Sequence, residues 1–273
     1  DALLGRSLYD LIDPQHWEAA RQRAIALQQG EKALPLVERK YLRLDGTPFT
    51  VEVAGVAIRS GGKALVQVVL RDISARKHGE QLLALEHAVS RSLAGADTVP
   101  AVMKAVMHSV CETQGWDCGR YFRLDEEAGV LRFDEFWSMP EAKLDEFIAR
   151  SRAVSYTPGA GLMGRVWQSG EALWVPDIAS DPRATQRIGQ DTGLRGAFLF
   201  PVMAEGRVIG VLGFNSRRVR EPDEGLRVAV RIVGSQIGQF LQRKHAEESL
   251  RRFRAAIDVS ADLVVLVDPV RLR

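Results

Sequence analysis

The sequence is poor in the features that mark membrane, secreted and disulfide-stabilised proteins. It contains no run of about 18 apolar residues, so no membrane-spanning helix is predicted. The chain opens with Asp-Ala-Leu-Leu-Gly, without the basic and apolar segments of a secretory signal. Its two cysteines, Cys111 and Cys118, are too few for a disulfide framework, and we expect both to pack in a core. These absences predict a cytoplasmic location.

Excess charge and catalytic motifs are also absent. The sequence has 37 Lys and Arg against 35 Asp and Glu, a net charge of +2, so nucleic acid is not an expected partner. It lacks Gly-x-Ser-x-Gly, a Walker phosphate loop, His-Glu-x-x-His and paired Cys-x-x-Cys motifs. The 26% of charged and 46% of hydrophobic residues are typical of a folded globular protein. We therefore predict no catalytic residues in this chain.

Two weaker patterns do not change this prediction. Gly159, Gly161 and Gly164 form Gly-x-Gly-x-x-Gly, but no buried parallel strand precedes it, so tight turns are favoured over a dinucleotide site. His108 and Cys111 are three residues apart and share a helix face. No third ligand accompanies them, and we predict no metal site.

The N-terminal third is rich in strand signals. Residues 41–58 alternate around an Asp-Gly turn at 45–46, which predicts a hairpin, and residues 66–73 predict a third strand. A helix is predicted from Pro14 through Gln29, ended by Gly30. Residues 71–77 then close the strands and open a charged helix. This junction is where a sensory domain would pass its state to a helix.

The residues of this segment resemble a PAS domain. RLDGTPFTVEVAGVAI and VQVVLRDISARK resemble its C-terminal half, with Ser74 in place of the usual threonine, and GRSLYDLIDPQHWEAARQRA resembles its helical middle. The resemblance implies that residues 1–84 are the C-terminal part of a PAS domain with its exit helix, and that the first strands are missing. A sheet without those strands would have an exposed edge and a compromised pocket.

The central segment predicts helices at 76–93 and 99–112, several strands, a clear hairpin at 196–215 and a long helix from Pro222. This order indicates an α+β fold with an antiparallel sheet. GLMGRVWQSGEALWVPDI and GLRGAFLFPVMAEGRVIGVLGFNS resemble the diagnostic blocks of a GAF domain, which we place at residues 85–245. Residues 246–273 resemble a linker helix and the start of a second PAS domain, with its first strand at 263–267.

Aromatic residues gather in the GAF-like segment, where they could line a small-molecule pocket or build the core. Core packing is the default for each of them, and exposure is the default for Arg165, which belongs to the Gly-rich stretch that borders the pocket in the family. The ligand-binding residues predicted on this basis are Phe122, Trp137, Arg165, Trp167, Phe198 and Phe200.

The ligand itself stays open at this point. Bilin-binding GAF domains attach their pigment through a later cysteine, and none follows Cys118. Cyclic-nucleotide members carry Asn-Lys and Phe-x-x-x-Asp-Glu; here Asn215 and Asp223 fit that pattern, but Ser216 and Val219 depart from it. Covalent bilin is therefore not expected, cyclic-nucleotide binding has no full motif, and the sequence leaves the cofactor unknown.

The resemblance implies a function in signalling. An apolar stripe along 226–241 predicts packing on the domain's own sheet, and its continuation beyond residue 245 favours a homodimer through the flanking helices. We interpret the chain as the sensory and signal-transmitting region of a PAS/GAF protein, with a sensor histidine kinase favoured as the parent. His87 lacks the acidic residue that follows a phosphoacceptor, so it is interpreted as a linker residue. The alternatives are a ligand-free dimerisation scaffold and the sensor region of a cyclic-di-GMP synthase or hydrolase.

Overall fold

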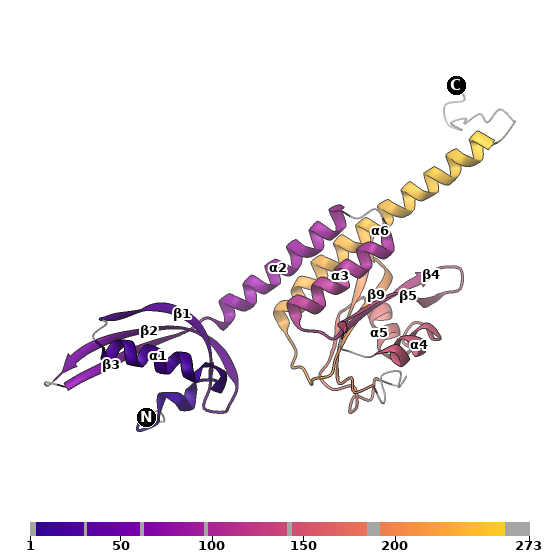
Figure 1. Cartoon of the computed structure of the whole chain (residues 1–273). Helices are drawn as coiled ribbons and strands as arrows, with labels where there is room; N and C mark the ends of the chain where they lie inside the picture. The colour runs from indigo at the N-terminus through magenta and orange to yellow at the C-terminus, as the bar shows by residue number, and fades with distance from the viewer. Residues whose placement is uncertain are drawn as a thin grey trace. The chain divides into compact units, whose positions relative to one another are not determined.

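The computed structural model describes residues 4–29, 32–60, 63–95, 98–140, 144–184 and 192–259. The chain folds as two units, Asp1–Gln81 and Leu82–Arg273, which we call the N-terminal and C-terminal units (Figure 1). Of the described helices, none is both long and apolar enough to cross a bilayer. Within the same residues, no group of three or more His, Cys, Asp or Glu side chains is placed to hold a metal ion.

The N-terminal unit is a three-stranded antiparallel sheet with the order β1 (Ala33–Leu42), β2 (Pro48–Ser60), β3 (Lys63–Asp72). The predicted Asp-Gly turn joins the first two strands. Asp45 accepts a hydrogen bond from the Thr47 amide at 2.8 Å, and Gly46 adopts a φ of 83°, which a residue without Cβ tolerates best.

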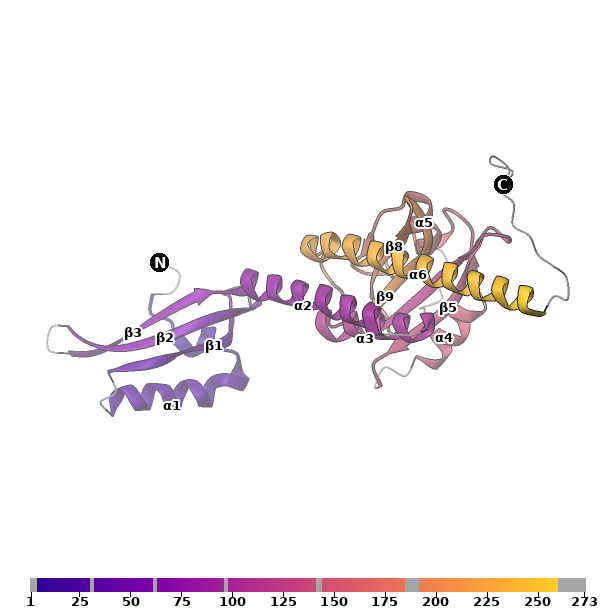
Figure 2. The same cartoon turned by 90° about the horizontal axis from the view of Figure 1, so that it is seen from above.

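Helix α1 (Trp17–Gln28) covers one face of this sheet (Figure 2). It begins three residues later than predicted, because Pro14–His16 forms a short 3₁₀ turn whose amide at Gln15 is capped by Asp13. The turn η1 (Leu8–Leu11) precedes it. A small core of Ile12, Tyr41, Val51 and Val53 lies on the helix-covered side.

The junction between strand and helix is held by hydrogen bonds. Asp72 at the end of β3 accepts a bond from the Ser74 amide at 2.9 Å, and Ser74 Oγ accepts one from the Thr50 amide at 3.2 Å. The bonds from Ser74 and the ion pair with Arg43 lower the pKa of Asp72 to about 2. Helix α2 (Ser74–Gly95) starts here and continues into the C-terminal unit. Asp72 therefore caps the first amide of α2, and the Ser74 hydroxyl ties this end of the helix to β2.

The C-terminal unit is built on a six-stranded antiparallel sheet with the order β6-β5-β4-β9-β8-β7. Its members are β4 (Cys118–Asp125), β5 (Val130–Ser138), β6 (Ser155–Tyr156), β7 (Leu173–Val175), β8 (Gly196–Ala204) and β9 (Arg207–Ser216). The predicted hairpin is the pair β8 and β9, joined through Glu205 and Gly206. The expectation of an α+β fold with an antiparallel sheet is confirmed.

Helices cover both faces of this sheet (Figure 1). On one face, α2, α3 (Val99–Gln114) and α6 (Glu224–Val259) share a core with aromatic residues of β8 and β9. The apolar stripe predicted on the last helix is part of it: Leu226, Val230, Val233 and Ile237 are all buried. On the other face lie α4 (Asp145–Arg152) and α5 (Gly161–Ser169). The strand expected at 263–267 lies outside the described residues.

Both cysteines are free and buried. Burial raises the pKa of the Cys118 thiol to about 12 and raises that of Cys111 as well. Thiols in this state are poor nucleophiles and poor metal ligands, because the thiolate is the reactive form. Their environment matches the packing role expected for them.

Candidate functional site

The most unusual side chain of the C-terminal unit is a buried arginine. Arg120 lies in the middle of β4 and is only 7% exposed. Its Nη1 donates to Ser151 Oγ of α4 at 2.9 Å, and its Nη2 donates to Asn215 Oδ1 of β9 at 3.2 Å. The guanidinium carbon lies 4.2 Å from the ring centroid of Phe147. Three elements therefore fix the guanidinium against the α4 side of the sheet.

These partners are all neutral. Ser151 Oγ in turn donates to the Phe147 carbonyl at 2.6 Å, and Arg120 Nε has no hydrogen-bond partner. Burial lowers the pKa of Arg120, and the nearby Tyr156 phenol acts in the opposite direction. No carboxylate pairs with this guanidinium in the described structure, although a buried charge normally requires an opposite one.

A cavity of about 40 Å³ adjoins the guanidinium, between β4, β6, β8, β9, α4 and α5. Its described lining residues are Arg120, Phe147, Tyr156, Leu162, Met163, Ile178, Ala184, Ala197, Leu199 and Asn215. The wall is apolar apart from Arg120, the Asn215 amide and the Tyr156 hydroxyl, and none of these lining residues is acidic. Such a site could hold a small anion, because charge-assisted hydrogen bonds to a fixed guanidinium are the strong ones.

The six residues predicted to bind ligand are divided between the two faces of the sheet. Phe198 and Phe200 lie in the core under the helices α3 and α6, with ring centroids 5.8 Å apart. Trp137 packs on His108 of α3, at 4.8 Å between ring centroids. These three residues do not line the cavity beside Arg120.

The other three lie toward α5 and its neighbours. Phe122 is buried and its ring is 5.8 Å from the Arg120 guanidinium carbon, so it comes nearest to the cavity. Arg165 is exposed on α5, and Trp167 is partly exposed beside a separate open groove that includes Met203. The structure does not gather the six residues in one pocket, and ligand contact by them stays a prediction.

None of the described residues that line this cavity is among the six predicted from the sequence. Arg120 is the only charged residue in an apolar run, Cys-Gly-Arg-Tyr-Phe, and this isolation was the available signal. Asn215 fitted the cyclic-nucleotide pattern, but here its side chain accepts from Arg120. Asp223 of the same pattern accepts from the Leu226 amide at 2.9 Å, so it caps helix α6.

The Gly-x-Gly-x-x-Gly pattern serves a tight turn. Gly159 and Gly161 adopt φ values of 79° and 57°, and the Gly159 amide donates to the Gly164 carbonyl at 2.8 Å. A Cβ on Gly164 would overlap the carbonyl oxygen of Thr157. The amides and the space around these glycines are therefore used within the chain.

Comparison with known proteins identifies the fold and the family. The family model of the GAF domain matches residues 96–242, which include α3, the whole six-stranded sheet and about half of α6. The chain therefore belongs to the GAF family. The GAF domain of a phosphoenolpyruvate-protein phosphotransferase from Coxiella burnetii has the same fold, with a TM-score of 0.53 and 15% identity over 62% of this chain and 98% of that one.

Two curated relatives are a kinase and a sensor. Sporulation kinase A of Bacillus subtilis is 31% identical over 83 residues, which are 30% of this chain and 14% of that protein. The methyl sulfide methyltransferase-associated sensor of Methanosarcina acetivorans is 23% identical over 279 aligned positions, which cover 98% of this chain and 28% of that protein. The chain thus spans well under a third of the length of either relative.

Proposed function

We propose that this chain is the sensory and signal-transmitting part of a larger signalling protein, and that its GAF domain binds a small ligand in the cavity beside Arg120. The observation that carries the proposal is the buried guanidinium, whose described partners are all neutral. A ligand with negative charge would supply the missing opposite charge. The GAF family and the match to a sensor protein over most of this chain support the general function.

The two faces of the sheet offer a route from the cavity to the helices. Arg120 and Asn215 face the cavity, whereas their chain neighbours Tyr121 and Phe214 are buried in the core under α2, α3 and α6. Helix α2 enters this core through Leu85. A ligand that shifts β4 against β9 would therefore change the seating of the helices at both ends of the GAF domain.

The identity of the parent protein belongs to the same proposal. A sensor histidine kinase is favoured, and the similarity of 83 residues to Sporulation kinase A supports it. A cyclic-di-GMP synthase or hydrolase is the alternative. We also propose that residues 1–84 and 246–273 are parts of PAS domains and that the protein is cytoplasmic. The sequence of the full-length gene distinguishes the two parents, since a phosphoacceptor helix or a Gly-Gly-Asp-Glu-Phe block would follow this segment.

One observation favours the second candidate function, a ligand-free dimerisation scaffold. The cavity of about 40 Å³ has room for a water molecule or a very small anion, far below the several hundred cubic ångströms of ordinary ligand pockets. A scaffold needs no larger cavity. The two functions differ in whether anything occupies the site.

Native mass spectrometry of the purified chain, with an absorption spectrum, tests this difference. We expect a bound anionic molecule at one per chain, because charge-assisted hydrogen bonds to a buried guanidinium are strong enough to keep a ligand bound through purification. The adduct should disappear from the Arg120→Met variant. A clean unliganded chain that no ligand of an anion panel stabilises would reject the sensor proposal in favour of the scaffold.

The last helix also has exposed apolar residues. Val228 and Ile232 of α6 are exposed, at 62% and 46%, and Leu250 follows Ile232 by 18 residues, or about five helical turns. Phe253, exposed at 48%, lies on the same face of the helix, opposite the buried residues. This face carries Gln239 and Arg243 between its two apolar ends, and we call its four apolar residues the exposed stripe. We propose that this exposed stripe pairs with its copy in a second chain.

Light scattering across micromolar concentrations checks the stripe. We expect the native chain to be a dimer, and Ile232→Glu with Phe253→Glu to give half that mass, because two charges per chain would enter an apolar seam. His245→Glu, an exposed position on another side of α6, should leave the mass unchanged. A monomeric native chain would remove the proposal.

A further inference from the structure

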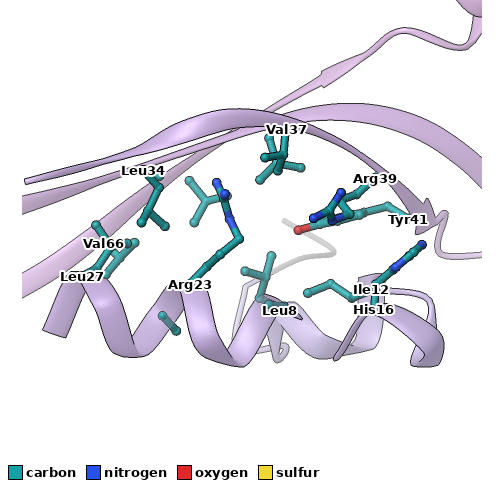
Figure 3. A pocket seen from close by; sticks show the side chains of 15 residues that line it. Leu8, Ile12, His16, Arg23, Leu27, Leu34, Val37, Arg39, Tyr41 and Val66 are labelled. Carbon is teal, nitrogen blue, oxygen red and sulfur yellow. The ribbon is translucent and has the colours of Figure 1, made fainter. Parts of the chain in front are cut away.

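The N-terminal unit contains a much larger cavity. It has a volume of about 360 Å³ and lies between α1 and the face of the sheet that α1 covers (Figure 3). The lining residues are Leu8, Ile12, His16, Ala20, Arg23, Ala24, Leu27, Leu34, Val37, Arg39, Tyr41, Val53, Gly55, Val66 and Val68. A cavity of this size is within the range that holds small organic ligands in proteins.

Most of the wall is aliphatic. Leu27 of α1 and Val53 of β2 are buried, and Leu34 and Val37 of β1 close the same side. Gly55 at the middle of β2 lets the side chains of Leu27 and Leu34 pack close to the strand, because a Cβ there would lie 3.4 Å from both. The described lining has no Trp or Phe, and its aromatic rings are those of His16 and Tyr41 at the polar end. The wall is therefore suited to a ligand whose apolar part is aliphatic, either a flexible chain or a compact group.

Two of the polar side chains that line the cavity are arginines; the others are His16 and Tyr41. Arg23 rises from α1 toward the sheet, and Arg39 reaches the cavity from β1 (Figure 3). No aspartate or glutamate is among the described residues that line it. The Arg23 Nη2 donates to the Pro35 carbonyl at 2.9 Å, and the Arg39 Nη1 donates to its neighbouring carbonyl, that of Glu38, at 2.9 Å.

These two arginines differ from others of the same unit. Arg43 pairs with Asp72 at 2.6 Å, and Arg76 pairs with Glu52 at 2.5 Å. Arg23 and Arg39 are half-buried, and neither forms an ion pair with any carboxylate in the described part of the chain. Half-buried guanidinium groups with free donors beside an apolar cavity are suited to a ligand's carboxylate, which accepts two hydrogen bonds from one guanidinium.

A hydroxyl group completes the polar end. Tyr41 is 5% exposed, and its hydroxyl points into the cavity near Arg39 (Figure 3). Burial raises the pKa of Tyr41, while Arg23 and Arg39 act in the opposite direction. The net pKa lies above its ordinary value, so the phenol is neutral at pH 7 and can donate a hydrogen bond to an anion.

We propose that the N-terminal cavity binds an aliphatic monocarboxylate, with its carboxylate between Arg23 and Arg39 and its apolar body against Leu27, Leu34 and Val37. The proposal does not depend on the GAF cavity, since all of its residues belong to the N-terminal unit. Sodium decanoate is a suitable probe, with 1-decanol as the neutral compound of the same chain length and sodium acetate as the charged head without the body.

Isothermal titration calorimetry of the full chain tests the proposal. We expect decanoate to bind at one per chain, decanol at least tenfold more weakly, and acetate without measurable heat in the same range. Arg23→Gln and Arg39→Gln should each weaken decanoate binding at least tenfold, because each removes a charge-assisted contact. Arg21→Gln, an exposed position on the same helix, removes equal charge and should leave the affinity unchanged.

Two further variants locate the site. Gly55→Val should weaken decanoate binding by filling the cavity, and circular dichroism of each variant checks that it folds. Arg120→Met changes only the C-terminal unit and should bind decanoate normally. Equal affinity for decanoate and decanol would overturn the proposal. So would unchanged binding in Arg23→Gln and Arg39→Gln, or loss of binding in Arg120→Met.

Discussion

Replacing Gly238 by alanine should lower the free energy of unfolding of the C-terminal unit by about 3 kcal/mol, which is at the upper end for overpacking a core. A Cβ on Gly238 would overlap the carbonyl oxygen of Met203 on β8, and one on Gly234 would overlap that of Pro201. The obstacles are backbone atoms, which cannot turn aside as a side chain does. Helix α6 would have to move off the sheet to admit a single methyl group.

Urea denaturation followed by tryptophan fluorescence measures this change. A Trp17→Phe background confines the signal to the C-terminal unit, because the other four tryptophans of the chain belong to it. Gly95→Ala is the matched control, because no atom lies within 4 Å of a Cβ at that helical position. The control should be neutral or stabilised by up to about 1 kcal/mol, as for glycine to alanine in a helix. A Gly238→Ala chain as stable as the native one would show that α6 is not seated this tightly.

The close seating of α6 also bears on signalling. Because the glycines at 234 and 238 allow backbone contact between α6 and β8, the helix has little freedom to move independently of the sheet. Strand β8 pairs with β9, which carries Asn215 of the cavity. A change at the cavity would therefore reach α6 through rigid elements rather than through a mobile side chain.

The fold could be predicted from the sequence wherever local signals agree with the tertiary structure. The Asp45-Gly46 turn and the hairpin of β8 and β9 have strong turn chemistry, and the helices have clear apolar periods. Of strand β1, the sequence predicts only the last residues, because the N-terminal part alternates poorly around a shift of register between Leu34 and Val37. A bulge of this kind breaks the period of two on which strand prediction depends.

The candidate sites were harder to predict, for a physical reason. Arg120 meets Ser151, 31 residues away, and Asn215, 95 residues away, so nothing near it in the sequence marks the contact. Aromatic residues were the visible signal, but Phe198 and Phe200 fill the core under the helices, as most large apolar residues do. In the N-terminal unit, Arg23 and Arg39 lie in segments rich in charge, and only the fold shows which arginines turn inward.

The second large effect is expected from Arg120→Met, which removes the buried charge while keeping an unbranched side chain. Sodium formate is small enough to probe the cavity, and at constant ionic strength it should raise the melting temperature of the native GAF domain above the value in sodium chloride. Binding to the folded state alone stabilises by RT ln(1 + [L]/Kd), about 2.7 kcal/mol at one hundred times Kd. The variant should lose this shift completely, because the guanidinium is the only cation in the described lining.

The stability of the unliganded variant separates a ligand-binding arginine from a structural one. Removing an unpaired buried charge relieves its desolvation cost, so Arg120→Met should be as stable as the native chain or more stable by about 1–2 kcal/mol. Arg165→Met, at an exposed arginine of α5, should keep both the native stability and the formate shift. The contrary result would be a free energy of unfolding several kcal/mol lower in Arg120→Met, with no effect of formate on the native chain. The guanidinium would then have a structural role, in which it holds Ser151 and Asn215 together. The GAF domain would then act as a scaffold.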